Sequence, residues 1–336
     1  MGKHFGPVWV LAELNDCRLE AVSLQLVGKA RELADELDVA CEVVFLGHGI
    51  EGAVPDLIAS GADHVYIGDC AALELYQPFP YRDIICSLAR EHAPEIILIG
   101  STFMGRELAP LIAARLETGL AAHCTGLRHD DDKNLELQIP AYGGLMSIIC
   151  PVRRPQMATV ARGVFKTPAP DTARKGEVVR IPVPEATDMP ARTLEIVRKP
   201  AAGIRLEDAR VVVSGGAGAC NPEGWEKIRE LAQALDAGLG CTRPVVDEGW
   251  APLHTMIGQS GKMVSPLAYI AIGLSGEQQH MVGISGAQLL VAVNNDPKSP
   301  VFGQVDLGVV EDCREFLPVL IAKIRAYREA RPGCRE

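Results

Sequence analysis

The chain lacks several features that would place it in a specialised class of protein. Its ten cysteines contain no CxxC pair, so neither a zinc site nor a dithiol redox motif is indicated. No apolar run approaches the ~20 residues of a membrane-spanning helix, and the amino terminus has neither a signal-type apolar core nor an Arg/Ser-rich leader. We therefore expect a cytoplasmic, unprocessed protein with no membrane insertion and no metal.

Basic character is also scarce. The chain has 33 Lys and Arg residues against 43 Asp and Glu, a net charge of −10, and no basic run. This balance argues against nucleic acid as a partner. The length of 336 residues exceeds what one core usually supports, so two domains are expected. Most of the cysteines are expected to be small buried apolar residues.

Short β-rich runs alternate with segments of helical periodicity in the first half of the chain. The expected strands are residues 8–11, 41–46, 64–67 and 96–100, and the expected helices are residues 20–37, 54–60, 81–92 and 106–117. Such alternation predicts an α/β domain whose mainly parallel sheet is covered on both faces. Four short strands then follow without helices and are expected to add an antiparallel layer: residues 121–127, 135–139, 147–150 and 156–160.

A segment rich in proline and charge, residues 167–205, marks the expected boundary between the domains. We place the N-terminal α/β domain at residues 1–195 and a second domain at residues 206–330. In the second domain the expected strands and helices alternate again, which predicts a small doubly wound sheet. Ligands of such sheets lie at the carboxyl ends of the strands, where Ser214, Thr242, Gly273 and Asn294 fall.

Glycine-rich and polar motifs follow these expected strand ends. Residues 214–218 form a turn typical of nucleotide-binding loops, although such turns are often purely structural. Arg243 supplies a permanent cation that can also stack on an aromatic plane. Ser260 lies in a Gly-bracketed turn, and His280 follows a Ser-Gly turn that opens a short helix. Backbone N–H groups at such a turn can address a pyrophosphate.

In this order and spacing the motifs resemble the FAD-binding domain of the alpha (large) subunit of an electron-transfer flavoprotein. The resemblance is carried by Thr242-Arg243-Pro244, Gly258-Gln259-Ser260-Gly261-Lys262, Ser275-Gly276-Glu277-Gln278-Gln279-His280 and Asn294-Asn295-Asp296-Pro297. In the first half, residues 99–110, 115–120, 124–127 and 154–160 resemble the first domain of the same subunit, so the similarity covers nearly the whole chain.

The resemblance implies that the second domain binds FAD and that three residues tune the flavin. Arg243 is expected against the isoalloxazine ring, the Ser260 hydroxyl at flavin N5, and His280 as a donor near flavin O2. Asn294 and Asp312 match positions that hold the adenosine part. The other expected cofactor contacts are Thr242, Ile257, Gly258, Gln259, Ser275, Gly276, Glu277, Gln278, Gln279 and Cys313. The chain departs from the family pattern at Ala217, Glu277 and Gln278.

The resemblance also implies partners. The N-terminal domain is expected to pack on a beta subunit, and electrons are expected to pass from acyl-CoA or other dehydrogenases, or from NADH through the beta subunit, to a flavoprotein or quinone reductase acceptor. The protein is then a redox carrier whose own side chains break no substrate bond. The segments around Thr242 and Asp247 are closer to electron-bifurcating members, whose beta subunit carries a second FAD.

Two alternatives of other classes stay open at this point. The first is a nucleotide-binding regulatory protein of the same fold without a redox role, which the departures at Ala217, Glu277 and Gln278 favour. The second is an NAD-dependent enzyme of similar architecture. A tightly bound yellow chromophore distinguishes a flavoprotein from both.

Overall fold

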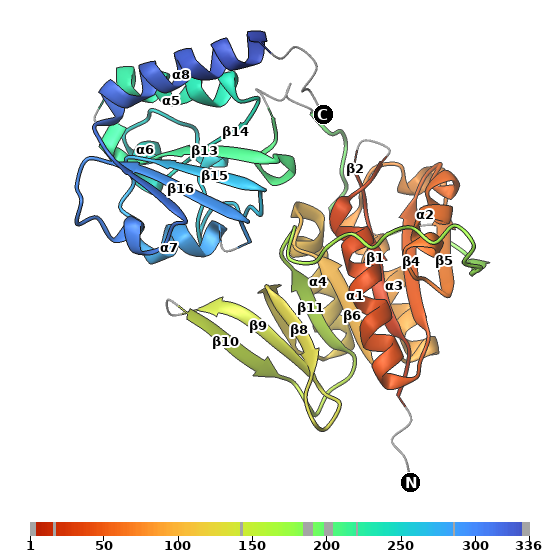
Figure 1. Ribbon diagram of the computed structural model, residues 1–336. Helices are drawn as coiled ribbons and strands as arrows, with labels where there is room; N and C mark the ends of the chain where they lie inside the picture. The colour runs from red at the N-terminus through yellow and green to blue at the C-terminus, as the bar shows by residue number, and fades with distance from the viewer. Residues whose placement is uncertain are drawn as a thin grey trace. The chain divides into compact units, whose positions relative to one another are not determined.

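The chain forms two compact units, Met1–Arg198 and Lys199–Glu336 (Figure 1). The computed structural model describes residues 5–15, 18–141, 144–183, 191–197, 204–219, 221–284 and 286–330. Expectations for Cys17, Cys220 and Cys334, and for linker residues 184–190 and 198–203, lie outside the described residues. Each unit contains a parallel sheet with helices on its faces, so the predicted two-domain α/β class is confirmed.

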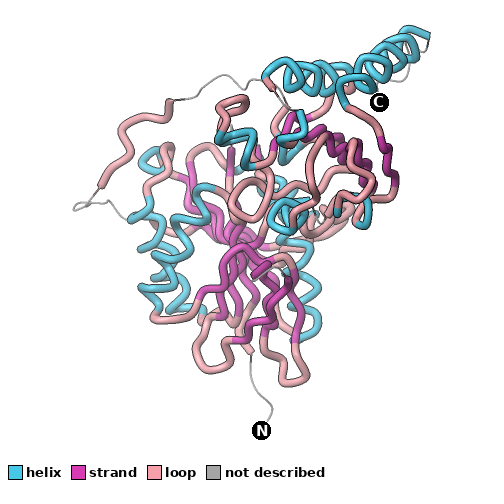
Figure 2. Tube along the Cα trace, turned by 90° about the vertical axis from the view of Figure 1, so that its left-hand side faces the viewer, coloured by secondary structure: helices cyan, strands magenta, loops and turns pink. Residues whose placement is uncertain are grey.

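The first unit is built on a parallel sheet with the strand order β12-β5-β4-β1-β6-β11-β7. Helices α1 and α2 cover one face, and α3 and α4 cover the other; Figure 2 shows helices on both sides of the strands. The strands are β1 (Val8–Ala12), β4 (Cys41–Gly47), β5 (His64–Asp69), β6 (Ile96–Gly100), β7 (Leu120–Cys124), β11 (Gln156–Val160) and β12 (Glu177–Arg180). The helices are α1 (Ala21–Leu37), α2 (Val54–Ala59), α3 (Pro78–His92) and α4 (Phe103–Leu116).

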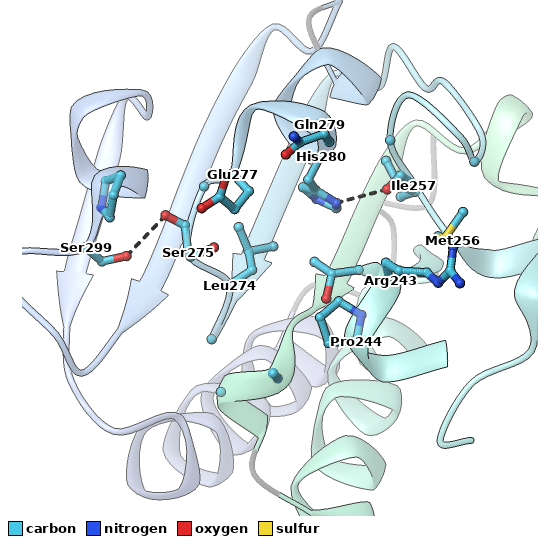
Figure 3. Close-up of a pocket in the computed structure, with 18 of the residues that line it drawn as sticks. Arg243, Pro244, Met256, Ile257, Leu274, Ser275, Glu277, Gln279, His280 and Ser299 are labelled. Carbon is cyan, nitrogen blue, oxygen red and sulfur yellow. Dashed lines mark hydrogen bonds between the residues drawn. The ribbon is translucent and has the colours of Figure 1, made fainter. Parts of the chain in front are cut away.

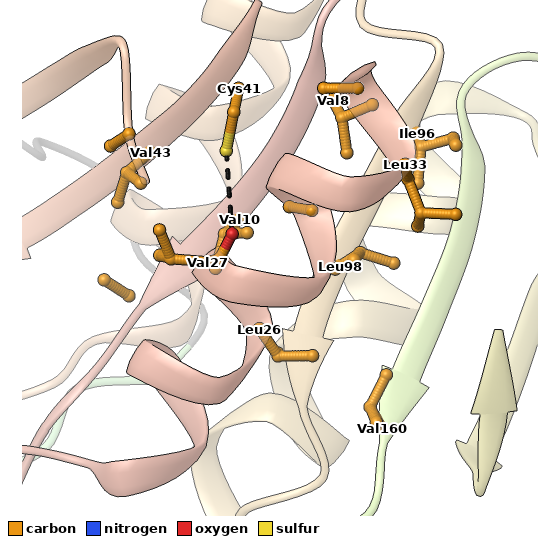
Figure 4. Close-up of a cluster of buried hydrophobic side chains, with 14 of the residues drawn as sticks. Val8, Val10, Leu26, Val27, Leu33, Cys41, Val43, Ile96, Leu98 and Val160 are labelled. Carbon is orange, nitrogen blue, oxygen red and sulfur yellow. Dashed lines mark hydrogen bonds between the residues drawn. The ribbon is translucent and has the colours of Figure 1, made fainter. Parts of the chain in front are cut away.

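The core of this unit follows from the alternation of side chains along its buried strands. Val8 and Val10 of β1 point to the face where Leu26 and Leu33 of α1 pack (Figure 4). Trp9, between them in sequence, belongs to the cluster on the opposite face. Because both faces of β1 are covered by helices, the strand reads as a continuous apolar run.

Two expectations about the first unit need correction. The strands β8 (Gly126–His129), β9 (Leu135–Ala141) and β10 (Gly144–Ile149) do form an antiparallel layer, but β7 and β11 join the parallel sheet instead. All five residues of β11 are buried because the strand lies between β6 and β7. The expected linker also contains β12, which pairs in parallel with β5 at the edge of the sheet.

A buried carboxyl group lies just beyond β1. Glu13 is 3% exposed, and its Oε2 accepts a hydrogen bond of 2.6 Å from the Thr102 hydroxyl. Its Oε1 has no hydrogen-bond partner within the described ranges. Burial disfavours the charged form and raises the pKa of Glu13 to about 7, although the hydrogen bond from Thr102 opposes this change.

We expect Glu13→Gln to stabilise the first unit at about pH 8 and to leave it nearly unchanged at about pH 4. The folded pKa lies above the ordinary 4.5, so the stability contributed by protonated Glu13 is present at low pH and is lost as the pH rises toward 7. The full loss is about 3 kcal/mol. Glutamine keeps an acceptor for Thr102 and cannot ionise. Thermal unfolding at the two pH values measures this, and equal differences at both would contradict it.

The second unit is a smaller parallel sheet with the order β14-β13-β15-β16-β17. Helices α5 and α8 pack on one face, and α7 lies on the side away from them (Figure 1). The strands are β13 (Val211–Gly215), β14 (Gly238–Cys241), β15 (Ala268–Ile272), β16 (Leu289–Asn294) and β17 (Leu307–Val310), and the helices are α5 (Pro222–Ala234), α6 (Arg243–Asp247), α7 (Gln278–Met281) and α8 (Cys313–Ala330). No helix within the described ranges is long and apolar enough to span a membrane.

Candidate functional site

A cavity of about 690 Å³ opens at the carboxyl ends of β13, β14, β15 and β16 in the second unit (Figure 3). The chain passes from β13 to β14 on one side and then returns to β15 on the other side of β13. Such a reversal of strand order leaves a crevice between β13 and β15, which is where doubly wound folds bind their ligands. The volume is in the usual range of small-molecule sites.

The cavity brings together most of the residues that the sequence predicts as cofactor contacts. Its lining includes Thr242, Arg243, Ile257, Gly258, Gln259, Ser260, Ser275, Gly276, Glu277, Gln279, His280 and Asn294. It also includes residues that the sequence analysis did not select, among them Met256, Leu274, Ser299 and Pro300. The only sequence signal for these was that they adjoin or lie between the selected residues.

Three predicted contacts are not part of the lining. Gln278 is exposed on α7, and Cys313 begins α8, where its Sγ donates to the carbonyl of Gly218 at 3.6 Å. The carboxylate of Asp312 accepts a 2.5 Å hydrogen bond from Arg314. Hydrogen bonds from the Arg314 side chain and backbone lower the pKa of Asp312 to about 2, so this carboxyl is ionised at neutral pH. A role for these three residues toward the cofactor stays a prediction.

The glycine-rich turn after β13 is packed against the turn after β15. The N–H groups of Gly216 and Gly218 donate to the carbonyls of Ile272 and Gly273, at 2.9 and 2.8 Å. A Cβ on Gly218 would lie 2.5 Å from the Gly273 carbonyl oxygen, so only glycine permits this approach. These two amides therefore serve the contact between the turns and are not available to a phosphate group.

Arg243 lies at the rim of the cavity as the first residue of α6. Its Nε donates to Oδ1 of Asp247 at 2.7 Å, one helical turn later, and its side chain is 66% exposed. The preceding Thr242 is different, because its Oγ1 is buried and has no hydrogen-bond partner in the part of the chain that the structure describes. The site thus offers a cation on its rim and a buried hydroxyl just behind it.

The turn that carries Ser260 is held against α7 through its backbone. The N–H of Gln259 donates to the carbonyl of Gln279 at 2.7 Å. Gly258 has a φ of +138°, and a Cβ there would lie 2.7 Å from the same carbonyl oxygen. The chain therefore needs glycine at this point, and Ser260, two residues later, is presented at the exposed side of the cavity lining.

His280 is buried beside the cavity, with 6% of its surface exposed. Its Nδ1 lies 3.0 Å from the carbonyl of Ile257, and its Nε2 lies 2.7 Å from the hydroxyl of Tyr269 (Figure 3 shows the first contact). Burial lowers the pKa of His280 to about 4, so the ring is neutral at physiological pH. Both ring nitrogens therefore contact groups of the protein, and the expected donor role of His280 toward flavin O2 stays a prediction.

Asn294 organises the opposite end of the cavity. Its Nδ2 donates to the carbonyl of Leu274 at 3.0 Å and to Ser299 Oγ at 3.2 Å, and its Oδ1 accepts from the N–H of Asp296. The Ser299 hydroxyl in turn donates to the carbonyl of Ser275 at 3.3 Å (Figure 3). These bonds tie the turn after β16 to the turn after β15.

The donors around the cavity fit a flat cofactor with an anionic part. The apolar side chains of Met256, Ile257 and Leu274 can cover a ring, while Arg243 adds a cation and the unpartnered Thr242 hydroxyl adds a hydrogen-bonding group. The described residues contain no cluster of three or more His, Cys, Asp or Glu side chains that could hold a metal ion. Fold and site together define a protein of the nucleotide-cofactor-binding α/β class.

Comparisons with known proteins specify that class further. Residues 8–186 match the electron transfer flavoprotein domain, and residues 205–285 match the electron transfer flavoprotein FAD-binding domain. Electron transfer flavoprotein subunit alpha of Thermoanaerobacterium thermosaccharolyticum is 41% identical over 324 residues, covering 96% of this chain and 98% of that protein. Protein FixB of Rhizobium meliloti is 38% identical over 93% of this chain and 91% of its own length. The acryloyl-CoA reductase electron transfer subunit beta of Anaerotignum propionicum is 34% identical over 97% of each chain.

The chain belongs to the electron transfer flavoprotein alpha subunit family, and its function is electron transfer. Both the family and this function are those predicted from the sequence motifs, so these two predictions are confirmed.

Proposed function

We propose that the chain binds one FAD in the cavity of its second domain, residues 206–330, and pairs through residues 1–195 with a beta subunit. The observation that carries this proposal is the gathering of all four sequence motifs around one cavity at the carboxyl ends of the strands. The match to an FAD-binding domain over residues 205–285 supports the choice of FAD over other nucleotide cofactors.

In this proposal, different lining residues contact different parts of the cofactor. Met256, Ile257 and Leu274 shield its ring from water, and Thr242 offers a hydroxyl to a polar atom of the ring. Arg243 provides positive charge where negative charge develops on reduction. FAD, when bound, supplies the electron-accepting chemistry. The protein sets its position and potential.

The proposed partners follow from the relatives. One relative is an electron transfer subunit of acryloyl-CoA reductase, which supports an enzyme of acyl-CoA redox chemistry as a partner, and we propose acyl-CoA or other dehydrogenases as the electron donors. A flavoprotein or quinone reductase is the proposed acceptor, and the cytoplasm is the proposed location.

Co-expression with a beta subunit, followed by extraction and quantification of the cofactors, tests the proposal. We expect a stable heterodimer that retains FAD, and a chain that is flavin-poor or poorly soluble when expressed alone. Two FAD per heterodimer would identify a bifurcating protein, and one FAD with AMP a non-bifurcating one. A heterodimer without flavin, or an FAD-saturated lone monomer, would contradict the respective part of the proposal.

We expect Ser260→Ala to retain FAD and to shift its reduction potential. The substitution removes one hydrogen bond toward the ring, which is worth about 0.5 to 1.5 kcal/mol. This energy corresponds to about 20 to 65 mV for one electron. Spectroelectrochemical titration measures the shift. Ser265→Ala, at an exposed serine outside the cavity lining, is the control. Complete loss of FAD from the Ser260 variant would mean that this residue supports the fold of the turn instead.

A further inference from the structure

A buried polar chain connects the middle of the second sheet with the cavity. Tyr269 lies in β15 and is completely buried. Its hydroxyl is 2.7 Å from His280 Nε2, and the Nδ1 on the other side of that ring is 3.0 Å from the carbonyl oxygen of Ile257. Tyrosine, histidine and carbonyl thus form one continuous line that ends in the turn carrying Ser260.

The chemistry of these three groups fixes the position of each proton. A carbonyl oxygen can only accept, so Nδ1 of His280 must carry the proton that is directed at Ile257. In the neutral ring Nε2 is then an acceptor, and the Tyr269 hydroxyl must donate to it. The Ile257 carbonyl therefore fixes the tautomer of His280, and the Tyr269 hydroxyl satisfies the remaining ring nitrogen and holds the ring in this orientation.

The held carbonyl belongs to the backbone that forms one wall of the cavity. Ile257 donates its own N–H to the carbonyl of Cys241, and Gln259 donates to the carbonyl of Gln279. Within the described ranges, two hydrogen bonds join this turn to α7: the Gln259 N–H donates to the Gln279 carbonyl, and the His280 side chain contacts the Ile257 carbonyl. If the His280 ring turns away from Ile257, the side-chain half of that attachment is lost.

We propose that Tyr269 is a positioning residue of the cofactor cavity, which acts through the orientation of the His280 ring to hold the turn of residues 257–261 and with it Ser260. This inference rests on the proposed FAD function for its consequence, but its structural step concerns the protein alone. Tyr269 touches no cofactor in this scheme. This role gives a reason for the buried hydroxyl of Tyr269 in β15, whose other residues are apolar.

The first test needs no variant. Long-range proton–nitrogen NMR correlation on the full chain with its beta subunit, labelled with nitrogen-15 at histidine, reports which ring nitrogen carries the proton. We expect His280 to be protonated at Nδ1 and not at Nε2. Protonation at Nε2 would overturn the proposal, and this result does not depend on whether FAD is the cofactor.

The second test uses Tyr269→Phe, which removes the hydroxyl and keeps the ring. His280 Nε2 then lacks its donor, so we expect its nitrogen-15 resonance to shift and the FAD dissociation constant to rise by about two- to tenfold, the range of one net hydrogen bond. Tyr327→Phe on α8, where the side chain is 58% exposed, is the matched control and should change neither quantity. An unchanged Nε2 resonance and unchanged FAD affinity in the Tyr269 variant would reduce Tyr269 to a packing residue. If the wild type binds no FAD, the proposed function fails, while the tautomer measurement still decides the structural step.

Discussion

Replacing Arg243 with alanine is expected to lower the first reduction potential of the bound flavin by between about 40 and about 170 mV. The variant loses a positive charge beside a ring that becomes more negative on reduction. At ~4 Å this interaction is worth about 4 kcal/mol for an effective dielectric constant of 20 and about 1 kcal/mol for bulk water. With about 59 mV for each ~1.4 kcal/mol, these values give the two limits.

The structure favours the lower half of that range. The Arg243 side chain is 66% exposed, and it is already paired with Asp247 at 2.7 Å. Solvent and the carboxylate both weaken the field of the guanidinium at the ring. Spectroelectrochemical titration of the FAD-replete heterodimer measures the shift. An unchanged potential would mean that Arg243 does not act on the flavin and serves only in its ion pair with Asp247.

Two further variants separate charge from geometry. Arg243→Lys keeps the charge but loses the planar group, so it should recover part of the potential and no stacking. Asp247→Asn removes the negative charge next to Arg243, and its potential should therefore rise. A fall in the Asp247→Asn variant would show that the carboxylate serves to orient Arg243 more than to offset its charge.

Replacing Gly258 with alanine is expected to lower the free energy of unfolding of the second unit by about 2 to 4 kcal/mol and to weaken FAD binding. A φ of +138° is a conformation that side chains rarely adopt, which alone costs about 1 to 3 kcal/mol. The added Cβ would also lie 2.7 Å from the carbonyl oxygen of Gln279, so the turn must move. Urea unfolding followed by tryptophan fluorescence gives the stability, since Trp225 lies in the core of this unit.

Gly249→Ala is the matched control for the contact. Gly249 also has a positive φ, +74°, but no atom lies within 4 Å of an added Cβ. We expect only the strain of the left-handed conformation, about 1 to 2 kcal/mol, and unchanged FAD binding. If both variants lost the same stability and both kept FAD, the contact between Gly258 and α7 would have no importance for the cavity.

The sequence predicted elements best where local signals agreed with the tertiary structure. The strand expected at residues 96–100 matches β6 (Ile96–Gly100), and the helix expected at residues 20–37 differs from α1 by one residue. In contrast, β12 was hidden in a segment whose prolines and charges suggested a linker. It is a strand because β5 offers an open edge, and only the folded sheet contains that information. The same holds for β17, which pairs with β16 and was not predicted.

The candidate site shows a similar limit. The motifs indicated which residues would meet, because the carboxyl ends of parallel strands share one edge of a sheet. They did not indicate which group each side chain would have as its hydrogen-bond partner. The partner of Arg243 had a sequence signal, because Asp247 is four residues away, but the segment was treated as a turn and not as a helix. The partner of His280 had none, because nothing in the spacing of Tyr269 places its hydroxyl within 2.7 Å of the ring.

The position of β11 in the first sheet has a consequence for synthesis on the ribosome. β7 (Leu120–Cys124) is made before β11 (Gln156–Val160), yet β11 lies between β6 and β7. During translation β7 therefore cannot pair with β11, its neighbour in the sheet, until about 36 further residues have been synthesised. At bacterial or eukaryotic elongation rates of about 5 to 20 residues per second, this interval lasts about 2 to 7 s. For that time the edge of β6 that β11 later occupies stays open to premature pairing with β7.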